Sequence, residues 1–170
     1  MKRAAIVLLM LGASGCGPQE KPTDPAATPA VEAPAAAVVA PSAELAADEL
    51  PAPDGEITVS GLTAGQRVSS PLVIEGFVKN DWMFEGVFPV EIASDGETLA
   101  QNAGQQQAPD NWTNPGPVKF RTELVFDVMK ETPAVVIFRE DMPKPKSPDS
   151  DEPGPGRTLR IPVVLVPPAQ

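Results

Sequence analysis

Residues 55–166 alternate short apolar runs with turn residues, which is the pattern of an all-β domain. Glu56–Ser60 alternates polar and apolar side chains, as a half-buried strand does. Asp95-Gly96 predicts a tight hairpin, because this pair accepts the positive φ angles that such a turn needs. The run at 133–139 is the most apolar and is expected to be central. Seven strands are predicted, at residues 56–60, 71–78, 87–93, 98–101, 118–126, 133–139 and 158–166.

Short strands at this spacing, without a helical period, indicate a sandwich or a barrel. Seven strands in about 110 residues match the size of an immunoglobulin domain. We therefore predict an immunoglobulin-like β-sandwich of about seven strands over residues 55–166, followed by a short tail at 167–170. The Cys…Trp…Cys pattern of antibody domains is absent, so the predicted sandwich has no disulfide.

The first 15 residues have the layout of a secretory signal. Lys2 and Arg3 precede an apolar stretch, Ala4–Gly12, that is far shorter than the roughly 20 residues of a membrane-spanning helix. Small side chains at Ser14 and Gly15 then lead directly to Cys16, the single cysteine of the chain. An ordinary secretory signal followed by an incidental cysteine is the alternative interpretation.

The sequence Leu11-Gly12-Ala13-Ser14-Gly15-Cys16 resembles the lipobox of bacterial lipoproteins. The resemblance implies a diacylglyceryl group on Cys16, cleavage between Gly15 and Cys16, and acylation of the new amino terminus, with palmitate for example. The protein is then exported and anchored in the membrane by lipid. Gly17 stands where Asp is an inner-membrane retention signal, which favours the periplasmic face of the outer membrane. In a cell without an outer membrane, the expected place is the outer face of the cell membrane.

Residues 16–54 separate this anchor from the predicted sandwich. They are rich in Pro and Ala, contain no aromatic residue and carry a single base, Lys21, among several acids. Such a segment cannot bury enough apolar surface to offset its ordering entropy. We therefore expect a disordered acidic tether that holds the domain away from the membrane.

Composition excludes several kinds of chemistry. The chain has no histidine, so neither a Ser-His-Asp nor a Cys-His catalytic unit is available. One cysteine and no histidine also rule out a Cys/His zinc site and an intrachain disulfide. The net charge of −10 argues against nucleic acid as a partner, since phosphate binding requires clustered Lys and Arg. We expect neither an enzyme nor a bound cofactor.

Three stretches carry a family resemblance: ITVSGLTAGQRVSSPLVIEGFV, WMFEGVFPVEI and DGETLAQ. They resemble the immunoglobulin-like domain of bacterial spore germination, which often occurs beside a GerM-type domain in envelope proteins. The resemblance extends over most of residues 56–166. It implies a non-catalytic binding or interaction module of the cell envelope. The sequence contains no GerM-type domain, so a role in germination does not follow.

Trp82, Glu85 and Trp112 are the candidate residues for a partner or ligand surface. One interpretation is an aromatic patch for a glycan or a peptide, with Glu85 fixing the orientation. In the other, which we expect, Trp82 and Phe84 cap the sandwich core and Trp112 folds back over the sheet. An exposed aromatic cluster would favour the first interpretation, and burial of both tryptophans would exclude its glycan-binding form.

The predicted function is therefore display of a binding module that contacts an envelope protein or a wall polymer. A structural spacer or an assembly subunit of an envelope complex is the alternative. A carboxylate-based glycan hydrolase is disfavoured because the sequence offers no obvious cleft. An acidic loop is expected to be solvated rather than to bind Ca²⁺, because its spacing matches no EF-hand; it contains Asp141, Asp149, Asp151 and Glu152. The oligomeric state stays open.

Overall fold

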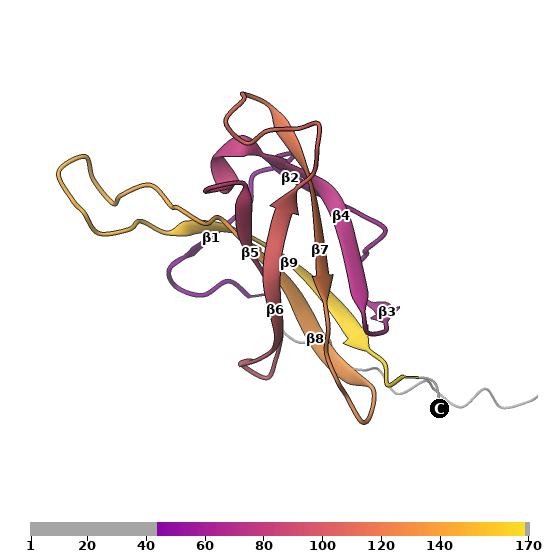
Figure 1. The fold of residues 1–170 in the computed structure, drawn as a ribbon. Coiled ribbons are helices and arrows are strands. Elements are labelled where there is room, and N and C mark those ends of the chain that lie inside the picture. The colour runs from indigo at the N-terminus through magenta and orange to yellow at the C-terminus, as the bar shows by residue number, and fades with distance from the viewer. Residues whose placement is uncertain (1–43, 169–170) are drawn as a thin grey trace, which may run out of the picture. The chain divides into compact units, whose positions relative to one another are not determined.

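The structure, a computed structural model, describes residues 44–168. The predicted signal peptide, Cys16 and most of the predicted tether lie outside the described residues. Within them the chain forms nine strands and one short 3-10 helix, η1 (Asn80–Trp82), as Figure 1 shows. The strands are β1 (Glu49–Pro51), β2 (Ile57–Ser60), β3 (Gln66–Val68), β4 (Leu72–Lys79), β5 (Val87–Ser94), β6 (Glu97–Gln106), β7 (Pro117–Leu124), β8 (Thr132–Arg139) and β9 (Gly156–Leu165).

The strands form one curled sheet that folds into two facing layers. Its order is β1-β9-β8-β5-β6-β7-β4-β2, with β3 paired to β9 in addition. Strand β6 pairs with β5 along its length but joins β7 only through Gln105 and Gln106, so it links the layers. The orders β2-β4-β7-β6 and β5-β8-β9 correspond to the two sheets of an immunoglobulin domain. The predicted all-β, immunoglobulin-like class is confirmed.

Alternating side chains of both layers fill the space between them. Phe120 of β7 lies at the centre, with its ring centroid 5.0 Å from that of Phe88 on β5 and 6.2 Å from that of Phe138 on β8. All three rings are buried, and both pairs are edge-to-face, a favourable arrangement for aromatic rings. As expected, β8 is a central strand, lying between β5 and β9.

All seven predicted strands are present, and two short strands were not predicted. Strand β3 begins at Gln66, the last residue of a segment that reads as a turn, and pairs in parallel with Val163–Leu165 of β9. Three residues, Gln-Arg-Val, are too few to show a strand period. The Asp95-Gly96 hairpin is confirmed, with φ angles of 50° and 84°.

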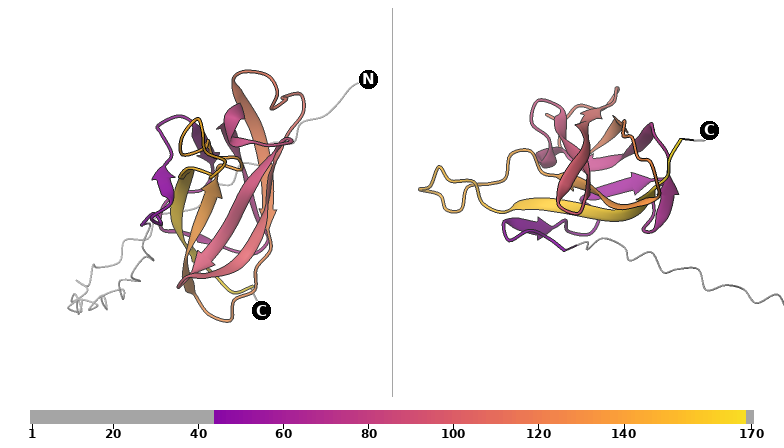
Figure 2. Two further views of the ribbon diagram at one scale, coloured as in Figure 1. Left: turned by 90° about the vertical axis from the view of Figure 1, so that its left-hand side faces the viewer. Right: turned by 90° about the horizontal axis from the view of Figure 1, so that it is seen from below.

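Strand β1 corrects the predicted boundary of the tether. It lies within residues 16–54, for which the sequence predicts disorder, yet it pairs in parallel with β9 from Glu49↔Gly156 to Pro51↔Thr158. Figure 2 shows β1 beside β9 on the outside of the sandwich. The prediction is therefore wrong for residues 49–51. The sequence of this segment has no alternation of apolar and polar residues that would predict a strand. It becomes a strand because it pairs with the free edge of β9.

Ion pairs hold this segment against the outer face of the second layer. The Glu49 carboxylate accepts a hydrogen bond from Arg139 Nε at 3.0 Å, and Arg160 Nε lies 3.5 Å away. Arg139 in turn pairs with Glu91 of β5. In the sheet, Ile137 lies between Glu91 and Arg160, and it is buried although it faces away from the core. We call residues 44–52 the strap, because β1 extends the sheet beside β9 and Glu49 ties it to Arg139 and Arg160 on the outer face.

Replacing Glu49 with Ala should loosen the strap without unfolding the sandwich. Hydrogen bonds to charged groups contribute about 1.5–3 kcal/mol each, so local opening should become at least about tenfold more frequent. Amide hydrogen exchange at Ala52, whose N–H donates to the carbonyl of Thr158 at 2.9 Å, measures this opening. Glu97→Ala, at an exposed site on β6, is the control and should leave the exchange unchanged. Unaltered protection of Ala52 in Glu49→Ala would contradict the assigned role.

Candidate functional site

Trp82 is the first of the predicted site residues, and the structure places it inside the protein. Its side chain is fully buried at the end of η1. The indole Nε1 donates a hydrogen bond to Glu56 Oε2 at 3.1 Å, and the Arg157 guanidinium lies 5.4 Å from the ring centroid. Of the two interpretations, capping of the core is therefore correct for Trp82. It is excluded as a surface residue.

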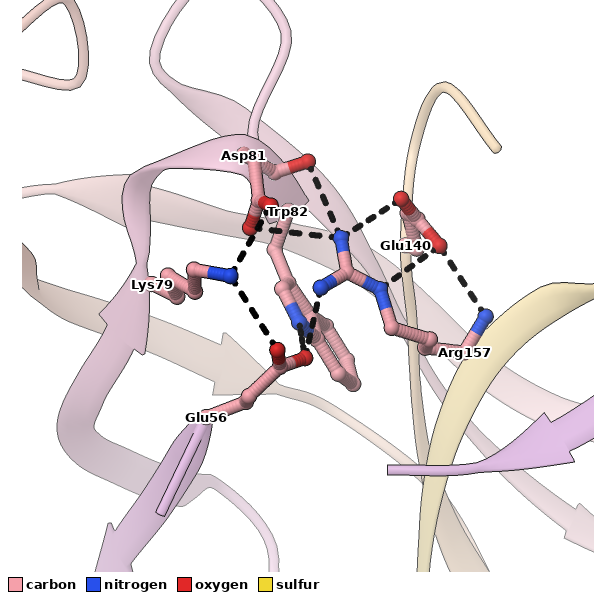
Figure 3. A network of polar contacts seen from close by, with 6 residues as sticks. All are labelled: Glu56, Lys79, Asp81, Trp82, Glu140 and Arg157. Carbon is pink, nitrogen blue, oxygen red and sulfur yellow. Dashed lines mark hydrogen bonds and ion pairs between the residues drawn. The ribbon is translucent and has the colours of Figure 1, made fainter. Parts of the chain in front are cut away.

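Arg157 organises the polar groups around this indole, as Figure 3 shows. Its Nη2 lies 2.6 Å from Glu140 Oε1, and its Nε lies 2.9 Å from Glu140 Oε2. The backbone N–H of Arg157 also donates to Glu140 Oε2, at 3.1 Å. On its other side, Nη1 lies 2.5 Å from Glu56 Oε2. A bidentate guanidinium–carboxylate pair with this geometry fixes both partners.

Lys79 and Asp81 complete the group. Lys79 Nζ lies 3.2 Å from both Glu56 Oε1 and Asp81 Oδ2. Asp81 Oδ1 is buried and lies 3.2 Å from Arg157 Nη2, an ion pair without a hydrogen bond. We call these residues, with Trp82, the Arg157 cluster: Glu56, Lys79, Asp81, Trp82, Glu140 and Arg157. They come from the start of β2, the end of β4, η1, the end of β8 and the start of β9, so the cluster ties both layers together at one end.

The pKa shifts in the cluster follow from these contacts. Burial opposes ionisation of Glu56, but hydrogen bonds from Trp82, Lys79 and Arg157 outweigh it and lower its pKa. Burial also disfavours the charged form of Arg157, yet its hydrogen bonds with Glu140 leave the pKa above its ordinary value. Both shifts favour charged partners at neutral pH. Each carboxylate of the cluster is paired with a cation, which suits a structural role better than proton transfer.

Two residues beyond Trp82, the chain turns outward. Met83 is buried, whereas Phe84 is 43% exposed, so the expectation that Phe84 belongs to the core is wrong. Phe84 and Val87 exchange backbone hydrogen bonds of 3.0 and 3.1 Å around Glu85 and Gly86. The φ angles of 53° at Glu85 and 80° at Gly86 are those of a two-residue hairpin turn, and Phe84 is exposed where this turn begins.

Trp112 lies beside Phe84 although the two are 28 positions apart in the chain. Their ring centroids are 6.2 Å apart, with an angle of 59° between the ring planes. Trp112 is half-buried and packs against the core with one side. Glu85 is exposed on the adjoining turn. We call Phe84, Glu85 and Trp112 the aromatic rim. The structure thus brings two of the three predicted site residues together, and Phe84 replaces Trp82.

Backbone and side-chain hydrogen bonds fix the rim to the sheet. The Gln106 N–H donates to the Gly86 carbonyl at 2.9 Å, and Gln106 Oε1 accepts from the Trp112 N–H at 3.0 Å. The φ of 80° at Gly86 favours glycine, and a Cβ there would lie 2.9 Å from Gln106 Cδ, so a larger residue would displace the Gln106 side chain. Gln106 therefore connects the Glu85–Gly86 turn to the loop that carries Trp112.

The acidic loop is a narrow arm that projects from the sandwich between β8 and β9, visible in Figure 1 as the orange-to-yellow segment. A bridge between Pro145 and Pro153 holds its two sides together. Within residues 44–168, no three acidic or cysteine side chains gather closely enough to hold a metal ion. Burial raises the pKa of Asp141 at the base of the arm.

Comparison with protein-family models, curated proteins and solved structures finds no match to this chain. In the part of the chain that the structure describes, no helix is long and apolar enough to cross a membrane. The site is therefore defined by its geometry: a partly buried charged cluster around Trp82, and an aromatic rim that begins two residues further along the chain.

Replacing Arg157 with Met should destabilise the fold strongly. The substitution keeps much of the aliphatic stem but leaves Glu56, Asp81 and Glu140 without their common cation. Breaking one side of a buried ion pair costs about 3–5 kcal/mol. Arg121→Met, which removes an exposed ion pair with Glu75, is the control and should cost under about 1 kcal/mol. Urea unfolding measures both, and equal losses would contradict a special role for Arg157.

Acid should weaken the cluster through Glu56. Because the folded-state pKa of Glu56 is lowered, its ionised form stabilises the fold above the ordinary value of 4.5. That stabilisation is lost as the pH falls from 4.5 through the folded-state pKa. Glu56→Gln should therefore lower Tm at pH 7, and the gap to the unsubstituted protein should narrow below pH 4.5. Glu97→Gln is the control; a gap that is constant with pH would refute the assignment.

Proposed function

We propose that this chain is an exported, lipid-anchored protein of the cell envelope that displays a non-catalytic immunoglobulin-like binding module. The observation that carries the proposal is the aromatic rim: the ring centroids of the exposed Phe84 and the half-buried Trp112 lie 6.2 Å apart, on loops at one end of the sandwich. Loops held by a rigid sandwich are the usual place for binding residues in this architecture.

The anchor is supported by the sequence around Cys16. Two or more acyl chains hold a protein stably in a membrane, whereas one chain anchors it marginally. A lipobox cysteine that carries both a diacylglyceryl group and an amino-terminal acyl chain meets this condition. Residues 17–43 then lie between the lipid attachment and the strap in the sequence.

A binding role suits the chemistry of the described residues better than catalysis. The carboxylates of the Arg157 cluster are bound to Lys79 or Arg157, and the chain offers no histidine as a general base. Glycoside hydrolysis requires two carboxyl groups facing each other across a cleft. The aromatic rim instead presents apolar ring surface with a single carboxylate, Glu85, beside it.

Cys16→Ser tests the anchor. In a bacterial host labelled with palmitate, the unsubstituted chain should incorporate label and sediment with membranes, because Cys16 carries the acyl chains. The Cys16→Ser variant should incorporate no label and should run as an uncut or soluble species. Ser14→Ala keeps a small side chain before the cleavage site and should still be labelled. Labelling or unchanged membrane retention of Cys16→Ser would contradict the proposal.

A further inference from the structure

We propose that the aromatic rim binds a neutral polysaccharide of the envelope, with sugar rings stacking on Phe84 and Trp112. The inference rests on the proposed binding function and names its ligand class. Both rings belong to loops at one end of the sandwich, and neither is fully covered by the protein. The 59° angle between their planes gives two differently oriented stacking surfaces within 6.2 Å, a spacing suited to successive faces of a chain of sugars.

The rim is already assembled without a ligand. Phe84 is held by the two backbone hydrogen bonds of the Glu85–Gly86 turn, and Trp112 is held by its bond to Gln106. In the Trp112 loop, Asn111 Oδ1 accepts hydrogen bonds of 3.0 Å from both the N–H and the hydroxyl of Thr113. Asp110 Oδ2 accepts one of 2.7 Å from the Lys119 N–H. Because the backbone of both loops is fixed in this way, little loop entropy is lost when a ligand binds, and weak stacking contacts suffice for measurable affinity.

The polar groups around the rings are mostly neutral amides and hydroxyls. In the rim loops, residues 83–90 and 105–116, there is no Lys or Arg. The exposed polar residues of these loops are Gln105, Asn111, Thr113 and Asn114, with Glu85 as the exposed acid. Amides both donate and accept hydrogen bonds, which matches sugar hydroxyls. This combination of aromatic faces with a few amides and a carboxylate is suited to an uncharged, hydroxyl-rich chain.

The charge of the rim disfavours polyanions. An anionic polymer requires clustered cations, whereas the ionised groups of the rim loops, Glu85 and Asp110, are both acidic. Phe77, on the outer face of β4, is exposed to a similar extent, 46%, but is paired in the sheet with Lys119 and Thr58 and has no aromatic partner. Phe77 therefore provides a matched control: an exposed phenylalanine without a second ring beside it.

The test uses the detergent-solubilised full-length chain with three probes: chitohexaose, cellohexaose and purified peptidoglycan sacculi. Titration calorimetry follows the oligosaccharides, and co-sedimentation follows the sacculi. Tryptophan fluorescence gives an independent readout, because Trp112 is half-exposed whereas Trp82 is buried. We expect binding of at least one of the two neutral oligosaccharides together with a change in emission. Binding of the sacculi alone, which carry peptide carboxylates, would contradict recognition of a neutral sugar chain. Binding of chitohexaose alone indicates recognition of acetamido sugars, and binding of both oligosaccharides indicates recognition of the sugar ring itself.

Phe84→Ala should weaken this binding about tenfold or more, as central aromatic contacts commonly do. Phe77→Ala should leave it unchanged. Trp112→Ala would remove a ring that also packs on the core and could therefore destabilise the fold. Trp112→Phe is used instead as the second variant; it should keep part of the affinity and lose the change in tryptophan emission. Thermal unfolding of each variant separates lost binding from lost folding. Equal weakening by Phe84→Ala and Phe77→Ala would overturn the proposal.

Absence of binding to all three probes would also overturn the glycan proposal. The binding function itself is then tested by a separate experiment. Crosslinking in intact cells, followed by capture of the chain, then compares the unsubstituted protein with Phe84→Ala. Loss of a crosslinked protein in Phe84→Ala would retain the binding module and replace the glycan with a protein partner. An identical crosslinking pattern, together with no glycan binding, would refute both proposals.

Discussion

The interaction on which the candidate site depends is the contact between Arg157 and its carboxylates. A guanidinium placed between Glu140 and Glu56, with a buried indole beside it, connects the residue before β2, the residue after β8, the start of the last strand β9 and the η1 turn. Such a group costs desolvation energy, which is offset only if each partner is satisfied with good geometry. Here two distinct carboxylates and a backbone N–H meet that condition. The cluster therefore favours one arrangement of the strand ends and loops at this end of the sandwich.

The aromatic rim follows directly from this arrangement. Trp82 is drawn inward by its hydrogen bond to Glu56 and its stacking under Arg157. The chain must then leave the core, and the left-handed turn at Glu85 and Gly86 carries Phe84 to the surface. Trp82 and Phe84, which are separated only by Met83, thus have opposite roles: Trp82 is buried in the core, and Phe84 is exposed on the surface.

The fold was largely predictable, because alternation and turn residues act over a few positions. The seven expected strands and the Asp95-Gly96 hairpin are all present. The short strands β1 and β3 were not predictable, since each depends on an edge of β9 that exists only after the sandwich has formed. For the site, Trp112 was identified from its loop composition. Phe84 was expected in the core, because it is apolar and follows Trp82 and Met83. The tight turn at Glu85 and Gly86, where the chain reverses, was not recognised from the sequence.

The sequence by itself determined the all-β class and the positions of seven strands, since these depend on short-range patterns and on residue types. Lipid attachment at Cys16 is a prediction that also rests on the sequence alone. Only the tertiary structure decided which tryptophan is buried, which carboxylates share Arg157, and that Glu49 holds the strap. These facts depend on contacts across 17 to 101 positions of the chain. Local periodicity carries no information about such separations, because burial and charge pairing are settled by whichever strands the fold brings together.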